Sequence, residues 1–446
     1  MEVETMNLSV LDQLSSHRCA CGRAHVFASK VLVKSGAIAE LPALVRALPA
    51  SRVFVLADEN TYEAAGRAVC AALESAGIGV SLYVFPEKTP KPDELHTGMA
   101  LLHYDAACDA VLSVGSGVLN DIGKVLSAAA GKPYVIVGTA PSMDGYASAT
   151  SSMTRDGLKI TLPSKCPDLI VGDLDVLCQA PQEMLLSGLG DMLAKYVSIC
   201  EWRIGHLITG EYYCETIAQM VRTALRRCIS QADGLLRREP EAVAAVFEGL
   251  ILGGAAMGCA GVSRPASGME HYISHIWDMR AIQFGTPETF HGTQCAVGTL
   301  LVLRAYEKLR TVTPDREAAL RHAWQFRYAP WAAQLRALLG RSAESMIALE
   351  AKEGKYDPQA HEKRLEIILT HWQELLQIMQ EELPSSQELE SLMQRLGLPV
   401  RAAQLEQDEA LLPTVMNAAK DIRDKYVLSR LVWDLGLSDT FFEDLR

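Results

Sequence analysis

Residues 109–121 read Asp-Ala-Val-Leu-Ser-Val-Gly-Ser-Gly-Val-Leu-Asn-Asp, an apolar run that passes through two glycines into a segment with helical spacing. The apolar run indicates a buried strand, and the periodicity that follows indicates a helix. Because glycine has no side chain, Gly115 and Gly117 allow backbone N–H groups to approach a pyrophosphate at the helix start. The turn is a weak signal by itself, since Asn120 stands at the third glycine position of the G-x-G-x-x-G fingerprint. A tight turn without a ligand is the alternative interpretation.

Strands and helices alternate on both sides of this turn. Apolar runs occur at 52–57, 79–85 and 134–138, and segments with helical spacing at 61–76, 93–103 and 118–130. Such alternation predicts parallel strands joined by crossover helices. The runs 157–162 and 167–171 are expected to be further strands, at an edge of the sheet or completing it.

After about Pro181 the sequence changes to helical segments rich in alanine, leucine, glutamate and arginine. Helices are expected over 187–201, 211–232, 240–258, 269–279 and 292–309, and a turn at 381–386 separates two later amphipathic helices. The predicted fold is an α/β N-terminal Rossmann-like domain with a mostly parallel sheet, followed by an all-α C-terminal domain. We place the dinucleotide-binding α/β domain at residues 1–180, the helical metal- and substrate-binding domain at 181–446, and the active site in the cleft between them.

Composition excludes several classes of protein. The chain has 446 residues, of which 49% are hydrophobic and 22% charged, an ordinary globular balance with a large core. A net charge of −12 argues against a broad nucleic-acid or anionic-membrane surface, so an anionic substrate needs a focused cationic site. The first residues lack the pattern of a signal peptide, and no apolar run of membrane-spanning length is found. We therefore expect a cytoplasmic enzyme with no nucleic-acid partner and no membrane insertion, and a homodimer as the commonest assembly.

The 11 cysteines are scattered, which is typical of reduced core thiols. The exception is Cys19-Ala-Cys-Gly-Arg-Ala-His25, where two thiols and an imidazole lie close in sequence. A closed zinc site needs four ligands, and the spacing of Cys19 and Cys21 is tighter than in the usual finger or ribbon. A structural turn is the favoured interpretation, with metal binding by Cys19, Cys21 and His25 as the alternative.

One carboxylate and three imidazoles in the helical half indicate a catalytic metal. Asp191 follows Ser187-Gly-Leu-Gly190, and His271 and His275 are four residues apart, so that they share a helix face. His291 begins a later helical segment. A carboxylate and two imidazoles fill three positions on a divalent cation and leave the fourth for water or substrate, with one histidine left for proton transfer. The alternative for Asp191 is a helix charge that balances Lys195, and for the histidines it is packing.

A second loop supports a cofactor beside this metal. The segment Thr139-Ala-Pro-Ser-Met-Asp-Gly-Tyr-Ala-Ser148 follows the next apolar strand and offers hydroxyls, backbone donors and a carboxylate. Neighbouring strand ends of a parallel sheet thus supply polar groups to one crevice. Asp58, near the end of an earlier strand, either accepts from an adenosine ribose hydroxyl or caps the next helix.

Together these motifs resemble the sn-glycerol-1-phosphate dehydrogenases, bacterial type, of the iron-dependent alcohol dehydrogenase and dehydroquinate synthase-like superfamily. The resemblance rests on the glycine turn ending in Asp121, the 139–148 loop, Gly190-Asp191, the 270–275 segment and His291-Gly292. It extends from about residue 31 to the C-terminus and includes Ala419-Lys-Asp-Ile-Arg-Asp-Lys-Tyr426. The chain departs from the usual pattern in reading Gly-Ser-Gly for three glycines and in carrying Asn120 in place of an apolar residue.

The resemblance implies a role for each matching residue. Asp191, His271 and His291 would bind one divalent metal, either zinc, nickel or iron, while Asp144, Asp191 and His275 would act on the substrate. The residues implied to contact NAD or NADP are Gly117, Val118, Leu119, Asn120, Asp121, Thr139, Ala140, Pro141, Ser142 and Ser148.

The implied reaction is reduction of dihydroxyacetone phosphate to sn-glycerol 1-phosphate and its reverse, in phospholipid or ether-lipid metabolism. The metal would act as a Lewis acid on the carbonyl oxygen, and His275 would relay the proton. Lys195 and Arg264 are candidates for the substrate phosphate. The alternatives are a glycerol or other iron-type alcohol dehydrogenase, a dehydroquinate-synthase-like lyase, and a binding protein without turnover.

Overall fold

The computed structural model describes residues 8–16 and 18–445 of the chain. Packing divides the chain into two compact units, here called unit 1 (Met1–Met192 with Gln219–Val262) and unit 2 (Leu193–Ala218 with Ser263–Arg446). The chain therefore crosses from one unit to the other after residues 192, 218 and 262. Helix α11 (Pro240–Ala260), which the sequence analysis placed in the helical half, belongs to unit 1 because its apolar side chains pack on the sheet.

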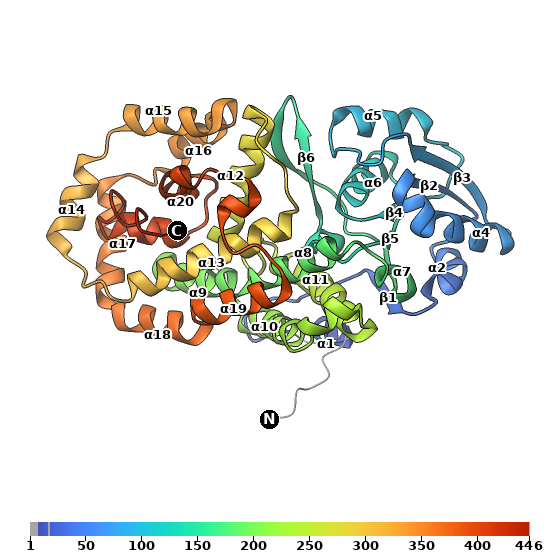
Figure 1. Cartoon of the computed structure of the whole chain (residues 1–446), viewed down its shortest axis with the longest axis horizontal. Coiled ribbons are helices and arrows are strands. Elements are labelled where there is room, and N and C mark those ends of the chain that lie inside the picture. The colour runs from blue at the N-terminus through green and yellow to red at the C-terminus, as the bar shows by residue number, and fades with distance from the viewer. Residues whose placement is uncertain (1–7, 17, 446) are drawn as a thin grey trace. The chain divides into compact units, whose positions relative to one another are not determined.

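Unit 1 contains a six-stranded parallel sheet with the order β1-β8-β5-β4-β2-β3 (Figure 1). Every pairing in this sheet is parallel, as the alternation of strands and helices predicted. Its strands are β1 (Lys30–Lys34), β2 (Arg52–Asp58), β3 (Gly79–Phe85), β4 (Ala110–Gly115), β5 (Tyr134–Gly138) and β8 (Leu169–Asp173).

Four strands differ from the expectation, and one of them, β6 (Thr150–Arg155), was not predicted as a strand at all. β8 is not at an edge but lies between β1 and β5, and its five residues are all buried, as is typical of an interior parallel strand. β7 (Leu158–Pro163) is outside this sheet and forms an antiparallel pair with β6. The edge strand β1 was not predicted, because its sequence, Lys-Val-Leu-Val-Lys, has an apolar run of only three residues between two lysines.

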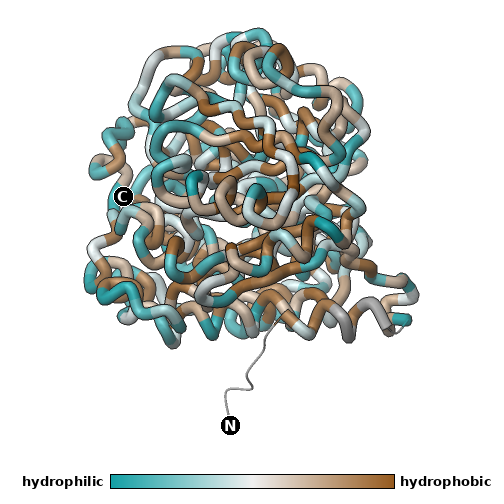
Figure 2. Tube along the Cα trace, turned by 90° about the vertical axis from the view of Figure 1, so that its right-hand side faces the viewer, coloured by the Kyte–Doolittle hydropathy of each residue, from teal (hydrophilic) through white to brown (hydrophobic). Residues whose placement is uncertain are grey.

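The interior strands β2, β4, β5 and β8 are almost entirely buried apolar runs, as interior strands of a parallel sheet are, and Figure 2 shows hydrophobic segments inside the fold. Val53 and Val55 of β2 pack in one cluster with Val69 and Leu73 of α4 (Arg67–Ser75). On the other face, α6 (Gly117–Ala130) approaches β4 so closely that a Cβ at Gly123 would lie 2.1 Å from Ser113 Oγ. Burying each such valine or leucine stabilises the fold by about 1.5–3 kcal/mol.

Helix α11 is the most apolar helix of unit 1. It is long and apolar enough to cross a membrane, with a mean hydropathy of 1.8, which corrects the expectation that no such run exists. However, 83% of its apolar window is buried inside the protein. Its Phe247 ring lies where Gly138 and Gly172 leave room, since a Cβ would meet that ring at 2.8 Å and 2.3 Å, respectively. The helix therefore packs as a core helix.

Unit 2 is helical, as expected. The predicted helix 187–201 is two helices with a break at Ala194: α8 (Gln182–Leu193), which belongs to unit 1 up to Met192, and α9 (Lys195–Thr209), which belongs to unit 2. The predicted turn at 381–386 is confirmed, and Ser385 forms a capping box with Glu388 at the start of α19. The remaining helices are α10 (Glu215–Ser230), which spans both units, and α12 (Met269–Phe284), α13 (His291–Leu309), α14 (Arg316–Gln325), α15 (Tyr328–Leu339), α16 (Ala343–Glu353), α17 (Pro358–Thr370), α18 (Trp372–Glu382), α19 (Ser386–Leu396), α20 (Leu412–Ala418) and α21 (Leu428–Asp434). Unit 1 adds α1 (Ser9–Ser16), α2 (Leu41–Ala47), α3 (Glu59–Thr61), α5 (Glu94–His103), α7 (Leu174–Leu177) and the 3-10 helix η3 (Asp144–Ala147).

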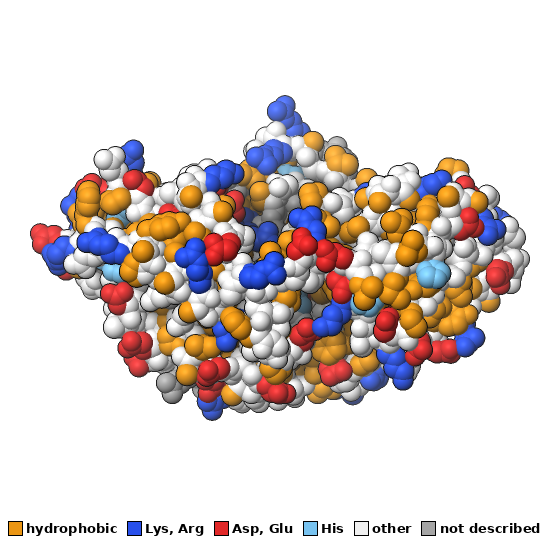
Figure 3. Space-filling model, turned by 90° about the horizontal axis from the view of Figure 1, so that it is seen from above, with side chains coloured by type: hydrophobic (Ala, Val, Ile, Leu, Met, Phe, Trp, Pro, Cys, Tyr) orange, Lys and Arg blue, Asp and Glu red, His pale blue; other side chains and the backbone are white. Residues whose placement is uncertain are grey.

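Charged side chains of both signs are interspersed on the face drawn in Figure 3. Unit 2 has ion pairs such as Arg304 with Glu390 at 2.9 Å and Arg316 with Glu362 at 3.0 Å. Exposed pairs of this kind contribute about 0–1 kcal/mol each. The stability of the units therefore comes mainly from their apolar cores.

Candidate active site

The carboxyl ends of β4 and β5 bring the glycine turn beside the following loop. The two strands pair with Val114 opposite Val137 and Gly115 opposite Gly138. Thr139 N then donates to Gly115 O at 3.1 Å. The two predicted cofactor segments therefore leave the sheet side by side, at the edge where ligands bind in open α/β sheets.

The two glycines of the turn meet different constraints. A Cβ at Gly115 would lie 2.6 Å from Leu119 Cδ1, so packing of the first turn of α6 requires glycine there. A Cβ at Gly117 would make only ordinary contacts, the nearest being Met143 Cγ at 3.4 Å. Ser116 precedes α6 without a side-chain capping bond, so its hydroxyl does not occupy the first-turn amides. The packing of unit 1 thus explains Gly115 but not Gly117.

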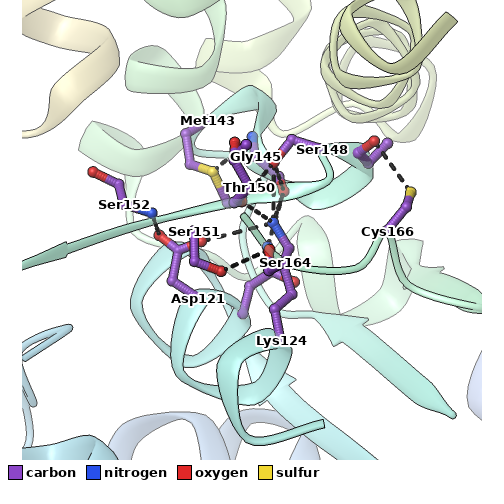
Figure 4. Close-up of polar contacts among 12 residues, drawn as sticks. Asp121, Lys124, Met143, Gly145, Ser148, Thr150, Ser151, Ser152, Ser164 and Cys166 are labelled. Atoms are coloured by element: carbon purple, nitrogen blue, oxygen red, sulfur yellow. Dashed lines mark hydrogen bonds and ion pairs between the residues drawn. The ribbon is translucent and has the colours of Figure 1, made fainter. Parts of the chain in front are cut away.

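Lys124 joins α6 to the loop that follows β5 (Figure 4). Its buried ammonium donates to Gly145 O at 2.6 Å, Ser148 Oγ at 3.1 Å and Thr150 O at 3.0 Å. The Asp121 carboxylate lies 3.7 Å from the same ammonium. Charge-assisted hydrogen bonds of this kind offset part of the cost of burying a cation. Lys124 therefore holds this loop against the helix of the glycine turn.

The predicted cofactor residues of α6 are placed differently. Leu119 and Asn120 are buried, and Asn120 Nδ2 donates to Gly145 O at 3.0 Å. Asp121 is half-buried and accepts from Ser152 N at 3.2 Å. Burial raises the pKa of Asp121 to about 6, although the Lys124 ammonium opposes this shift. Asn120 thus helps to hold the 145–150 loop.

The strand-end carboxylate Asp58 caps a helix. Its Oδ1 accepts from Thr61 N at 2.8 Å in a capping box at the start of α3. Burial raises the pKa of this carboxyl. Asp58 therefore caps α3, as one of the two interpretations expected, and its contact with the adenosine ribose of a cofactor stays a prediction.

In unit 1, Asp191 and Asp144 lie together. Asp191 is fully buried on α8, and its Oδ2 accepts from Asp144 N at 2.8 Å. Ser187 Oγ donates to Ser142 O at 3.1 Å, so α8 packs directly on the predicted cofactor loop. This approach depends on Gly188, where a Cβ would lie 1.8 Å from Pro141 O. Gly188 therefore has a packing reason.

In unit 2, the three predicted histidines come together. His271 and His275 lie on α12, and His291 is the first residue of α13. Ring centroids are 5.1 Å apart for His271 and His291, 6.0 Å for His275 and His291, and 6.4 Å for His271 and His275. The i, i+4 spacing on α12 and the start of α13 thus bring all three imidazoles to one place.

Hydrogen bonds fix the tautomers of two of these imidazoles. His271 Nδ1 lies 2.7 Å from Glu270 Oε1, and a carboxylate can only accept, so Nδ1 carries the hydrogen. Ser274 Oγ donates to Gln294 Oε1 at 2.7 Å, so it accepts from His291 Nδ1 at 3.1 Å. Both rings therefore keep the Nε2 lone pair for another partner, as metal-binding histidines do.

A thiol lies beside these imidazoles. Cys295 Sγ is 3.6 Å from His291 Nε2, and the ligand atoms of His271, His291 and Cys295 all lie within 4.8 Å of one another. Burial alone would raise the pKa of this thiol, but His271 and His291 lower it overall. The donor set of unit 2 is thus two nitrogens and a sulfur, which suits zinc, nickel or iron.

A buried carboxylate anchors the start of α12. Glu201 accepts from Met269 N at 2.9 Å and from Leu428 N at 2.8 Å. Burial and then the charge of Glu270 raise the pKa of Glu201 to about 8. Because α12 carries His271 and His275, Glu201 positions both imidazoles through the helix.

Three cationic side chains of unit 2, of which Lys195 and Arg264 are buried and Lys425 is half-buried, have backbone partners. Lys195 Nζ donates to Ala266 O at 3.2 Å, and Arg264 is paired with Glu211 and donates to Tyr426 O at 2.8 Å. Lys425 Nζ donates to Ser267 O at 2.7 Å. Burial and then the Arg264 charge lower the pKa of Lys425 to about 7. Arg264, one of two phosphate candidates, is therefore engaged in an internal ion pair.

Sequence reasoning missed Lys124, Glu270 and Cys295. Cys295 had a findable signal, since it lies four residues after His291 on the same helix and so on the same face. Lys124 lacked one, because a lysine on a helix is normally solvent-exposed. Glu270 precedes His271, and only coordinates show which way its carboxylate points.

Known proteins share sequence with this chain. A family model described as iron-containing alcohol dehydrogenase matches residues 32–181. A glycerol-1-phosphate dehydrogenase [NAD(P)+] of Halalkalibacterium halodurans is 29% identical over 415 residues, covering 92% of this chain and 94% of the relative. A protein of the same name from Geobacillus stearothermophilus is 30% identical, covering 68% of this chain and 77% of the relative.

The fold has solved counterparts. A crystal structure of glycerol dehydrogenase from Schizosaccharomyces pombe has a TM-score of 0.61 at 17% identity, covering 94% of this chain and 92% of that one. At this identity the likeness shows the fold alone. On the sequence relatives, the chain belongs to the glycerol-1-phosphate dehydrogenase family of enzymes within the iron-containing alcohol dehydrogenases.

Proposed function

We propose that the chain catalyses the metal-dependent, NAD(P)H-linked reduction of dihydroxyacetone phosphate to sn-glycerol 1-phosphate and the reverse oxidation. The observation that carries the proposal is the pair His271 and His291, whose Nδ1 atoms are both held so that both Nε2 atoms keep a lone pair. The name shared by its relatives, glycerol-1-phosphate dehydrogenase [NAD(P)+], supports the same reaction. The product would enter phospholipid or ether-lipid synthesis.

The proposed metal ligands are Asp191, His271 and His291. When bound, the ion polarises the carbonyl oxygen of the substrate and stabilises the negative charge that develops there. The chain prepares its ligands in advance, because Asp144 N holds the Asp191 carboxylate and Glu270 holds the His271 ring. Such outer partners raise metal affinity about 10–100-fold.

His275 and Lys195 have proposed roles toward the substrate. The His275 ring is half-buried, and its plane makes an angle of 18° with that of the stacked His291 ring. We propose that His275 moves the proton to and from the hydroxyl oxygen of the substrate. Asp144 is a second proposed substrate contact. Lys195 is the proposed phosphate partner. Its buried ammonium donates to Ala266 O at 3.2 Å, and a phosphate would accept a charge-assisted bond from the same group.

The proposed cofactor site is the edge formed by the glycine turn and the loop after β5. The nicotinamide ring, when bound, supplies the hydride. Gly117 leaves space beside the α6 N-terminus, where backbone amides favour a pyrophosphate. The proposed contacts are residues 117–121, residues 139–142 and Ser148.

The test is a substrate panel with the metal-replete enzyme. NADH or NADPH oxidation should require dihydroxyacetone phosphate, stop on chelation and return with metal. Asp191→Ala and His291→Ala should lose both the metal and activity, while His206→Gln in unit 2 is the matched control and should keep both. Failure of dihydroxyacetone phosphate to speed cofactor oxidation would refute the proposal.

Two other results would identify a different enzyme. Preference for unphosphorylated glycerol would indicate an iron-type alcohol dehydrogenase. Turnover without net change in cofactor redox state would indicate a dehydroquinate-synthase-like lyase. We also propose a cytoplasmic homodimer, which cell fractionation and light scattering would test.

A further inference from the structure

Residues 18–25 form a tight hairpin in unit 1, outside the site described above. Arg18 and Ala24 make an antiparallel bridge, and Cys19 N donates to Arg23 O at 3.1 Å. Gly22 N donates back to Cys19 O at 2.9 Å, with φ of 82° at Gly22. Only glycine adopts this left-handed backbone without strain. The hairpin is therefore a built turn, as its sequence indicated.

The turn gathers two thiols and an imidazole. The Sγ atoms of Cys19 and Cys21 and a ring nitrogen of His25 lie within 4.8 Å of one another. Cys21 Sγ is 3.3 Å from His25 Nε2. In tetrahedral zinc sites with bonds of about 2.0–2.3 Å, ligand atoms are about 3.3–3.8 Å apart. Side-chain adjustments of about 1 Å would therefore seat an ion among the three groups.

The His25 ring is oriented as in metal sites. The ring is buried, with 1% exposed, and its Nδ1 lies 3.0 Å from Cys259 O. Since a carbonyl oxygen can only accept, Nδ1 carries the hydrogen and Nε2 presents its lone pair to the thiols. A backbone carbonyl on the second ring nitrogen is the usual outer partner of a histidine that binds zinc.

The partner of His25 belongs to the core of unit 1. Cys259 and Ala260 are the last residues of the buried helix α11, and Arg23 Nη1 donates to Ala260 O at 3.4 Å. The hairpin is thus held to a rigid element. An ion at the thiols would fasten residues 18–25 to the end of α11.

We propose that Cys19, Cys21 and His25 bind a structural zinc ion, a second metal site separate from Asp191, His271 and His291. Two thiolates and one imidazole form a soft donor set that favours zinc over calcium or magnesium. Two thiolates also neutralise the charge of Zn²⁺. The short Cys-x-Cys spacing, which favoured a simple turn, is no obstacle, because the hairpin already places both sulfurs near the imidazole. The fourth position is filled by water or a further thiol.

Metal content and cobalt spectroscopy test the proposal on the full-length protein. Cys19→Ser/Cys21→Ser should lose one zinc equivalent relative to the wild type and keep the metal that His291→Ala removes. Cys178→Ser, another thiol of unit 1, is the matched control and should keep the wild-type zinc content. In the Cys295→Ala background, Co²⁺ should give a sulfur-to-metal charge-transfer band that disappears in the double serine variant. Equal zinc content in wild type and double variant, or no such band, would overturn the proposal.

Thiol protection in the wild-type protein keeps the test decisive if the double variant does not fold. Bound zinc should shield Cys19 and Cys21 from alkylation by N-ethylmaleimide, as mapped by mass spectrometry. Removing zinc with a chelator should speed their alkylation at least about tenfold, since the free thiolate is the nucleophile. Equal alkylation rates with and without zinc would refute the site. Because activity is not the readout, this result is independent of the proposed reaction.

Discussion

Gly188→Ala tests whether α8 must touch the loop after β5. The added Cβ would lie 1.8 Å from Pro141 O and 3.0 Å from Val246 Cγ1. Real Cβ atoms do not approach within 3.0 Å, so α8 or the loop must move by at least about 1.2 Å, the difference between 3.0 and 1.8 Å. The obstacle is a backbone oxygen, so no side-chain rotation relieves the contact.

The displacement breaks two hydrogen bonds that hold the site. Both bonds would stretch past about 3.5 Å. One runs from Asp144 N to Asp191 Oδ2 at 2.8 Å, and the other from Ser187 Oγ to Ser142 O at 3.1 Å. Overpacking costs about 1–3 kcal/mol, and a lost bond to a buried carboxylate about 1.5–3 kcal/mol. The helix propensity of alanine returns up to about 1 kcal/mol. We expect a net loss of about 2–4 kcal/mol in the free energy of unfolding.

Urea unfolding followed by far-UV circular dichroism measures this loss. Gly258→Ala is the matched control, because Gly258 is also helical and a Cβ there meets nothing within 4 Å. The control should be neutral or gain up to about 1 kcal/mol. Gly188→Ala should also lower kcat about 100-fold, because misplacing a reacting group by 1 Å has effects of this size. If the two variants were equally stable and active, the packing argument for Asp191 would be wrong.

Three further predictions concern groups around the site. Ser274→Ala should weaken metal affinity about 10–100-fold, because His291 Nδ1 loses the acceptor that fixes its tautomer. A competition titration measures this affinity, and an unchanged value would contradict the prediction. Asp121→Asn should stabilise the protein by up to about 3 kcal/mol at pH 8. Burial raises the pKa of Asp121 from 3.8 to about 6, so the wild-type protein loses stability as the pH rises from about 4 to about 6. Urea unfolding at several pH values should therefore show no difference in stability between the variant and the wild type below about pH 4. Lys124→Met should raise the Kd for NADH about tenfold, an effect of about 1.4 kcal/mol, because the loop loses its hydrogen bonds at Gly145 and Thr150. Fluorescence titration measures this Kd, and an unchanged value would rule the prediction out.

The parallel sheet was predictable because its strands carry strong local signals. β2, β4 and β5 are short apolar runs bounded by polar or glycine residues, and helices with clear spacing separate them. The place of β8 was not predictable, since strand order depends on long-range pairing that its five residues do not encode. Likewise, α11 reads like its helical neighbours, and only the glycines facing Phe247 explain why it packs on the sheet.

The histidines of the candidate site were predictable and their supporting contacts were not. His271 and His275 follow a spacing rule, whereas Ser274 and Gln294 meet His291 only because α12 and α13 lie side by side. Lys124 is the clearest example of this limit. Its burial depends on carbonyl oxygens at 145 and 150, which any sequence could provide.

Two features together distinguish the candidate metal-binding histidines of this chain: a hydrogen bond at Nδ1 and a thiol near the imidazole, which can serve as a second metal ligand. His25, His271 and His291 each have Nδ1 engaged and a thiol within reach of the imidazole. His206 Nδ1 also lies beside a carbonyl, that of Glu211, yet its ring is exposed and packs with Tyr213. A fixed tautomer is therefore not sufficient by itself. The same two criteria, applied without reference to catalysis, select His271 and His291 of the proposed active site and His25 of the N-terminal hairpin, so the two metal proposals share this observation but have separate tests.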